Sequence, residues 1–353
     1  MERKTVKDRF GRELNIYKVS GGRLSFTFIP ERGMDVGEIF VDGNKMSWER
    51  TEEALLHPDS VDLKAEGGWD AGFYCAVASL GPEVFGTPDE VRTVHGTGAY
   101  SPADPESVKY LEDDEKITVS ASLYIKGYDK KPEYKKTVRY ITYKSGTFLY
   151  REDLIENLTD KTLPLDDGYH VQLGGSFLKE GGRYLLPVRK SRMFLRDSAP
   201  AEEDPCMILP FDQKLDPIRC YQYIPERVEA DYGIKSLQPY KDLTDQYKNV
   251  TMEMLINKEK DMGAVLLREL DIFPRSLIAK RNITEPMYSI EPCKTRPNSV
   301  RQNAIDGELQ YIGPGECKKS SILLGYVSDR WELSLLEDAV TGAAGRFDGG
   351  IKG

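Results

Sequence analysis

Three consecutive segments with strand-like alternation constrain this chain more than any other feature. Residues 116–125 carry apolar side chains at every second position, which is the period of a β-strand with one buried face. Residues 134–143 form a matching segment, and Ser145-Gly146 provides a turn signal before a third segment, residues 147–156. Strands joined by short turns pair antiparallel. The sequence therefore predicts a meander of three long antiparallel strands.

Further strand signals run through both halves of the chain. Residues 23–29 alternate and stop at Pro30, while residues 35–41 end at Asp42-Gly43, a dipeptide that favours a type I′ hairpin turn. In the second half, strand signals cover residues 250–256, 263–268, 308–312 and 320–327.

Helical periodicity is confined to short segments. Residues 329–340 match a helix in which Asp329 and Glu332 form a capping box. Three apolar residues of this helix fall on one face: Trp331, Leu335 and Ala339. A weaker helix signal covers residues 48–56.

No segment has the composition of a linker, and no fixed-period repeat is present. Residues 199–248 are rich in Pro, Asp and Tyr without clear periodicity, so we expect long irregular loops there. We predict an all-β protein: one large antiparallel β-sandwich domain over residues 1–353, with few short helices.

Charge and composition narrow the classes of partner. The net charge of −9, with basic residues scattered among acidic ones, argues against nucleic-acid binding. No run of 18 apolar residues is present and the first residues are polar, so neither membrane association nor secretion is expected, and we expect a cytoplasmic protein. Exposed strand edges would allow a homodimer.

Several reaction chemistries lack their sequence signatures. The 5 cysteines are widely spaced without a C-x-x-C motif, so neither a disulfide framework nor a structural zinc site is indicated. Walker A, G-x-G-x-x-G, H-E-x-x-H and G-x-S-x-G motifs are also missing, and we expect no cofactor and no metal. A glycosidase with two carboxylates stays open, because 58 acidic residues offer many pairs.

Histidine is scarce, with only 3 in the chain. His170 and Gln172 alternate with apolar neighbours on a short strand, so the two polar side chains share one face, which meets either water or a binding cleft. His95 is followed by Gly96 and Gly98, which allow the backbone to approach a ligand closely. His57, before a proline, is expected at the end of a helix.

Glu291 is an acid in an otherwise apolar strand, directly before Pro292. Because proline cannot donate a ladder hydrogen bond, we expect the sheet to end or to have an edge there. Burial at this position would raise the pKa of the carboxyl group, as a general base requires. The alternative is a solvated carboxylate at a strand end.

Three further residues have two interpretations each. Arg32 and Asp35 lie in a tight turn between two strands, where they form either a local salt bridge or part of a binding site. Trp69 lies among glycines and is either a core residue or a stacking platform for the apolar face of a sugar.

The order of these landmarks resembles that of the aldose 1-epimerase (galactose mutarotase-like) superfamily, and looks nearest to its DUF4432 branch. The resemblance covers roughly residues 10–330. Its motifs are residues 31–35, Gly67-Gly68, Gly81-Pro82, His95-Gly96, Glu156-Asn157, His170 and residues 290–292.

The resemblance implies a β-supersandwich that holds a small sugar in a concave cleft. Glu291 would then remove the proton of the anomeric hydroxyl, His170 would protonate the ring oxygen, and His95 would bind near the ring. Arg32, Asp35, Trp69 and Gln172 are the further candidates for contacting the sugar. If these residues form one site, Glu291, His95 and His170 lie close together.

The chain departs from the mutarotase pattern in two places. Residues 168–173 read Gly-Tyr-His-Val-Gln-Leu instead of an Asn-His-x-x-Phe-Asn type of motif, and the aspartate that grips sugar hydroxyls is not matched to one position within residues 199–248. The hypothesis is an aldose 1-epimerase-like isomerase acting on an unidentified sugar. The alternatives are a carbohydrate-binding or sensing protein, and a sugar isomerase or lyase that uses the same site.

Overall fold

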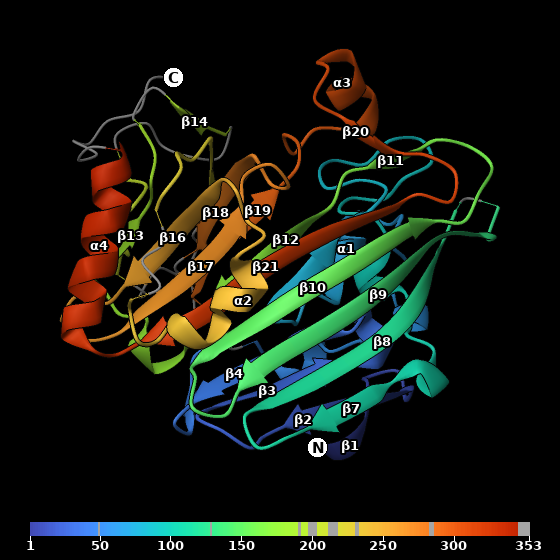
Figure 1. Cartoon of the computed structure of the whole chain (residues 1–353). Coiled ribbons are helices and arrows are strands. Elements are labelled where there is room, and N and C mark those ends of the chain that lie inside the picture. The colour runs from blue at the N-terminus through green and yellow to red at the C-terminus, as the bar shows by residue number, and fades with distance from the viewer. Residues whose placement is uncertain are drawn as a thin grey trace.

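Figure 1 presents the computed structural model, which describes residues 1–48, 50–127, 129–189, 192–196, 203–210, 218–229, 233–281 and 286–344. Almost all of its regular structure is antiparallel sheet. Within the described residues, no helix is both long enough and apolar enough to cross a membrane.

The first sheet has 11 strands. In spatial order they are β1 (Glu2–Lys7), β2 (Glu13–Val19), β3 (Leu24–Ile29), β4 (Asp35–Val41), β6 (Val77–Leu80), β12 (Gly168–Leu173), β19 (Met287–Cys293), β18 (Arg275–Arg281), β15 (Arg219–Tyr223) and β14 (Met193–Leu195), with β5 (Asn44–Lys45) paired to β4. Strands from both ends of the sequence therefore meet in its centre, where β12 pairs with β6 and β19.

The second sheet has 8 strands. Their order is β13 (Arg183–Leu185), β16 (Val250–Ile256), β17 (Gly263–Glu269), β21 (Cys317–Val327), β10 (Phe148–Asn157), β9 (Pro132–Tyr143), β8 (Lys116–Lys126) and β7 (Lys109–Glu112). A separate pair consists of β11 (Leu163–Leu165) and β20 (Gln310–Ile312). Figure 1 shows β8, β9 and β10 running side by side, which confirms the predicted meander.

The two sheets pack against each other through the largest apolar cluster, in which Phe26 of β3 meets Tyr140 of β9 at a ring distance of 5.4 Å. The hairpin prediction is also confirmed. Strands β4 and β5 are joined by Asp42 and Gly43, both with positive φ, as a type I′ turn requires. The predicted antiparallel β-sandwich is therefore the observed architecture.

Helices are few: α1 (Gly68–Ala71), α2 (Lys241–Thr244), α3 (Val300–Ile305) and α4 (Arg330–Ala344). Asp329 caps α4, since its Oδ1 accepts hydrogen bonds from the backbone N–H groups of Trp331 and Glu332 at 2.9 and 3.0 Å. The face of α4 that packs on the second sheet is centred on Leu333, Leu336 and Val340. Trp331, assigned from the sequence to the face of Leu335 and Ala339, is 73% exposed instead.

Two sequence-based expectations about secondary structure are wrong. In place of the helix expected at residues 48–56, the described part of this range contains a 3₁₀ turn, Glu52–Ala54, and it follows Ser47, which bridges to Leu173 in an extended conformation. The region expected as irregular loops, residues 199–248, contributes β15 to the first sheet, although residues 199–202, 211–217 and 230–232 lie outside the described residues.

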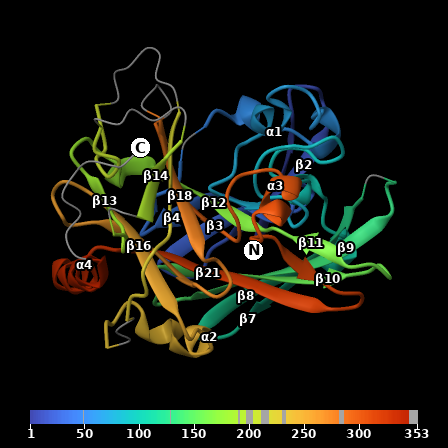
Figure 2. The same cartoon turned by 90° about the horizontal axis from the view of Figure 1, so that it is seen from above.

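The outer face of the first sheet carries a third apolar cluster. Residues of β6, β18 and β19 are covered there by the loops around α1, which bring Trp48, Trp69, Phe73 and Tyr100 onto the sheet. Figure 2 shows α1 on the side of this sheet that faces away from β8 and β10. This covered outer face is where the candidate site lies.

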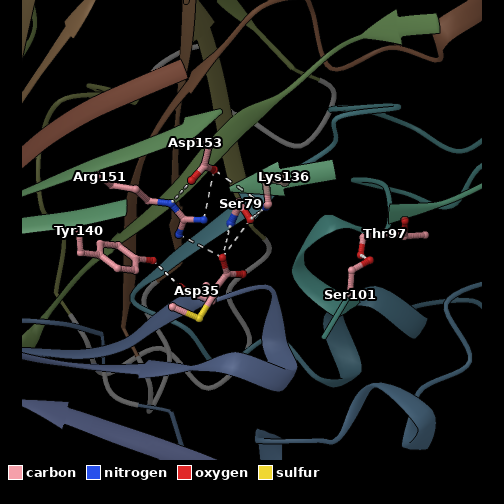
Figure 3. A network of polar contacts seen from close by, with 9 residues as sticks. Asp35, Ser79, Thr97, Ser101, Lys136, Tyr140, Arg151 and Asp153 are labelled. Atoms are coloured by element: carbon pink, nitrogen blue, oxygen red, sulfur yellow. Dashed lines mark hydrogen bonds and ion pairs between the residues drawn. The ribbon is translucent and has the colours of Figure 1, made fainter. Parts of the chain in front are cut away.

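A buried polar network joins the sheets (Figure 3). Arg151 of β10 contacts Asp35 of β4 at 3.1 Å and Asp153 of its own strand at 3.1 and 3.2 Å. Lys136 of β9 donates to Ser79 of β6 at 2.7 Å, and Ser79 donates to Asp35. Two carboxylate side chains face two cationic side chains, so the charges of this network balance although it is buried away from water.

Replacing Arg151 with Met should leave Asp35 and Asp153 with one cation between them. We expect the free energy of unfolding, measured in urea, to fall by about 3–5 kcal/mol because a buried charge loses its partner. The matched control is Arg23→Met, which breaks the half-exposed Arg23–Asp42 pair and should cost less than about 1 kcal/mol. Equal small losses in both variants would contradict a structural role for the network.

Candidate functional site

Strand β12 directs its side chains to the two faces of the first sheet in turn. Tyr169, Val171 and Leu173 enter the cluster between the sheets. His170 and Gln172 are also buried, and the strand period places them on the opposite face. The alternation predicted from the sequence is therefore present.

Strand β19 brings Glu291 opposite His170. The register of the two strands pairs Val171 with Ile290 and Gly168 with Cys293, which places His170 across from Glu291. The distance from His170 Nε2 to Glu291 Oε1 is 3.1 Å. Residues far apart in the sequence thus form a direct acid–imidazole contact.

Of the two expectations at Pro292, the edge is wrong, because β19 lies between β12 and β18, whereas the strand does end one residue later, at Cys293. The carbonyl oxygen of Pro292 faces β12, since a Cβ added to Gly168 would lie 2.6 Å from it. Along this side the paired residues skip from Gly168 to Val171. A proline is tolerated inside the sheet because the ladder is interrupted there, next to the His170–Glu291 contact.

The Glu291 carboxylate is buried without a strong cationic partner. It is 4% exposed, and among the described residues its ion-pair contact is with His170. Ser289, two residues earlier on the same face, donates from Oγ to Oε1 at 2.6 Å. Burial raises the pKa of Glu291, opposed by the Ser289 hydrogen bond, which is the direction expected of a carboxyl group at this position.

His170 is held on both ring nitrogens. Gln172 Nε2 contacts Nδ1, and Glu291 contacts Nε2. Burial lowers the pKa of His170 to about 3, so the ring is neutral at neutral pH. An amide nitrogen can only donate, so Nδ1 is unprotonated, and the ring proton is on Nε2, facing the carboxylate.

His95 approaches the same point from a loop. Its φ is +59° and that of Gly96 is +67°; a Cβ on Gly96 would come within 2.9 Å of Glu83. His95 Nδ1 donates to the Phe85 carbonyl at 2.5 Å, which leaves Nε2 as an acceptor. Burial lowers the pKa of His95 to about 4, and its ring centroid lies 6.2 Å from that of His170.

A cavity of about 240 Å³ opens beside the two histidines. It is lined by Trp48, Arg50, Gly67, Trp69, Asp70, Phe73, Val94, His95, His170, Ile218, Arg281 and Met287. Trp69 is 3% exposed, packs its ring edge to face with His95 at 4.7 Å and also lines the cavity, so it is a core residue at the cavity wall, and its role as a stacking platform for a sugar stays a prediction. Glu291 is not among the lining residues; it contacts His170, which separates it from the cavity.

Several lining residues escaped the sequence analysis. Arg50 and Phe73 come from the loops over the sheet, and Arg281 and Met287 come from the ends of β18 and β19. Nothing local marks the loop residues, because long-range packing brings them to the cavity. Ser289 could have been found, since period two places it on the same face as Glu291.

The structure does not bring Arg32 or Asp35 to this cavity. Arg32 is 1% exposed and donates to the backbone carbonyls of Leu56, Gly72 and Ala99 at 2.6 to 3.2 Å, so it anchors the loops. Asp35 is fully buried in the network between the sheets (Figure 3). Burial raises the pKa of Asp35, opposed by Arg151 and Lys136. Their short separation in the sequence carried no information about which face each side chain would occupy.

The landmarks expected to share a site meet in part. His95, His170 and Glu291 lie together, with Trp69 and Gln172 beside them, whereas Arg32 and Asp35 do not. Across the described ranges, no group of three or more His, Cys, Asp or Glu side chains is arranged to hold a metal ion. The arrangement can accept and donate a proton at one point beside a partly apolar cavity.

The sequence model of one protein family matches residues 11–325; this family is described as a domain of unknown function, DUF4432. No curated protein matches the chain.

Solved structures share the fold at low sequence identity. A candidate aldose 1-epimerase from Klebsiella pneumoniae subsp. pneumoniae MGH 78578 is 19% identical with a TM-score of 0.80, over 97% of this chain and 85% of that one. A galactose mutarotase-like protein from Clostridium acetobutylicum is 14% identical with a TM-score of 0.61, over 93% and 99%. A candidate aldose 1-epimerase from Escherichia coli K12 is 13% identical with a TM-score of 0.55, over 90% and 100%. Likeness at this level shows the galactose mutarotase-like fold alone.

Replacing Glu291 with Gln should stabilise the protein. The pKa of Glu291 is raised in the folded state, so the wild type loses stability as pH rises from the unfolded value through the folded one. We expect the free energy of unfolding in urea to increase by about 1 kcal/mol at about pH 8, and by less at about pH 5.

The matched control for this stability measurement is Glu253→Gln. Glu253 is equally buried but pairs with Arg268 at 2.9 Å, so its loss should destabilise the protein. A Glu291→Gln protein that is less stable than the wild type at about pH 8 would contradict the description of Glu291 as a buried carboxylate without a strong cationic partner.

Proposed function

The chain belongs to the DUF4432 family, and from its fold and site we propose that it is an aldose 1-epimerase-like enzyme that interconverts the anomers of a small sugar. One observation carries this proposal: Glu291, a buried carboxylate with a raised pKa, contacts the neutral His170 at the wall of a cavity. Groups whose pKa is perturbed by burial beside a cavity are candidates for general acid–base chemistry. The mutarotase-like fold supports the choice of substrate class.

In the proposed reaction, the anomeric end of the sugar replaces the direct contact between Glu291 and His170. The carboxylate then faces the anomeric hydroxyl, and Nε2–H faces the ring oxygen. Glu291 takes the hydroxyl proton, the ring oxygen receives the Nε2 proton of a His170 ring that has first taken a proton on Nδ1 from solvent, and the C1–O5 bond breaks. Rotation about C1–C2 and the reverse steps close the ring on either face and return both protons.

The other lining groups suit a sugar. His95 presents an unprotonated Nε2, which can accept a hydrogen bond from a hydroxyl group. Trp69 and Phe73 offer aromatic surface of the kind that packs against the C–H face of a pyranose. These contacts would hold the ring while leaving its anomeric end toward His170.

A second candidate function has its own observation. Arg50 and Arg281 both line the cavity, and guanidinium groups recognise carboxylates well. An isomerase or lyase acting on an acidic sugar would use the same acid and base and would form a new compound. A carbohydrate-binding or sensing protein is the third reading, in which sugar binds but anomers do not exchange faster.

Glu291→Gln should abolish catalysed anomer exchange. An amide cannot accept the hydroxyl proton, so we expect the rate to fall by about 100-fold or more, because general-base contributions are of this size. Exchange NMR on a panel of aldoses and uronic acids measures interconversion and any new product together. Undiminished turnover in the variant would remove Glu291 from the mechanism, and Glu106→Gln, an exposed acid, is the control.

His170→Asn should lower kcat strongly and leave sugar affinity mostly unchanged, since the lost proton donor acts in the transition state. The matched control is His57→Asn. His57 Nδ1 accepts from Asp59 N–H at 3.2 Å at the start of a 3₁₀ turn, and the residue does not line the cavity. If both variants kept the wild-type rate, His170 would not be the acid. Saturable sugar binding without exchange in the wild type would favour the binding-protein reading.

A further inference from the structure

We propose that Gln172 is a positioning residue whose side-chain amide, after a half-turn, accepts the Nδ1 proton of His170 and stabilises the cationic form that donates to the sugar. This inference rests on the proposed function for its catalytic consequence. The contact itself is independent of any reaction: Gln172 is 1% exposed and its amide is the hydrogen-bond partner of Nδ1.

The resting arrangement is a poor acid. Gln172 donates to Nδ1, so the only ring proton is on Nε2, against Glu291. If this neutral ring gave up the Nε2 proton, it would become an imidazolate, whereas an imidazolium gives up a proton near neutral pH. The proposed acid step is therefore easier after Nδ1 has taken a proton from solvent.

A protonated Nδ1 needs an acceptor in place of the amide nitrogen. Gln172 carries one, because its Oε1 is buried and has no hydrogen-bond partner among the described residues. Rotating the amide by a half-turn brings this oxygen to Nδ1 and breaks no other hydrogen bond of the side chain. An unpaired buried acceptor costs about 1–3 kcal/mol, and the half-turn exchanges that cost for the similar one of unpaired amide N–H groups, so neither orientation is strongly favoured until Nδ1 takes a proton.

Among the described residues, the charged and titratable groups around His170 do not provide this acceptor. Glu291 on β19 faces Nε2, and the His95 ring lies nearly perpendicular to that of His170. Asp70 of α1 acts on His170 through its charge. Phe73 covers the ring at 4.9 Å, edge to face. Control of the second ring proton therefore falls to Gln172.

Two substitutions separate this role from simple packing. Gln172→Met keeps the size but removes the acceptor, so kcat should fall by about 10- to 100-fold with KM little changed. Gln172→Glu supplies a permanent acceptor, so it should retain more activity than Gln172→Met. It should also shift the pH–rate profile to higher pH. A packing role predicts the opposite order, because methionine fills the space and a new buried charge does not.

The direct test needs no substrate. Two-bond ¹H–¹⁵N spectra distinguish protonated from unprotonated imidazole nitrogens, and the chain has only 3 histidines. At neutral pH we expect His170 to carry its proton on Nε2 and His95 to carry its proton on Nδ1, the opposite tautomer. In Gln172→Glu, both nitrogens of His170 should be protonated at the same pH, with His57 and His95 unchanged.

The outcomes remain separable if the proposed function fails. A protein that turns over no sugar but shows the expected spectra supports the contact and overturns only the reaction. If Nδ1 of His170 is protonated in the wild type, or if its titration is the same in the wild type and in Gln172→Glu, the proposal is wrong. Gln302→Met, an exposed glutamine of α3, is the control and should change neither spectrum nor rate.

Discussion

The pairing of β12 with β19 is the constraint on which the candidate site depends. It places His170 across from Glu291 in the middle of a sheet, where both side chains are withdrawn from water. Burying a carboxylate in such a position destabilises the folded protein, because burial disfavours the charged form. The surrounding strands hold it there, and the free energy of the sheet covers the cost. The ladder is interrupted at these positions, next to Pro292.

The two buried polar clusters of this protein differ in charge balance. Between the sheets, Asp35 and Asp153 face Arg151 and Lys136, so the charges balance and the groups join strands of both layers. On the outer face, Glu291 meets a neutral imidazole and one hydroxyl group. The first cluster is balanced in charge without a ligand, although one oxygen of Asp35, Oδ2, has no hydrogen-bond partner among the described residues. The unbalanced one, next to a cavity, is the place where a proton can be accepted and given.

Local patterns predicted the parts of this structure that local physics determines. The meander, the Asp42-Gly43 turn and the shared face of His170 and Gln172 follow from the two-residue period of a strand and from turn chemistry. The nearness of His170 and Glu291 could be expected only through the resemblance of ordered landmarks to a known superfamily, because no periodicity relates residues so far apart.

The wrong predictions concern features that tertiary packing determines. Arg32 is a charged residue in a turn, yet tertiary packing buries it against carbonyl groups of three loops. Pro292 suggested an edge because proline lacks a donor, and the sheet accommodated it by leaving neighbouring positions unpaired. Arg50 and Phe73 reach the cavity through loops whose path depends on the whole fold. Sequence patterns report which residues share a face; they do not report what covers that face.

A crystal structure of the protein with a bound aldose would test the central claim most directly. The account predicts a sugar in the cavity beside Trp69. Its anomeric oxygen should lie about 3 Å from the Glu291 carboxylate, and its ring oxygen about 3 Å from His170 Nε2. The direct contact between these two side chains should then be broken. A sugar bound with its anomeric end turned away from an intact His170–Glu291 contact would contradict it.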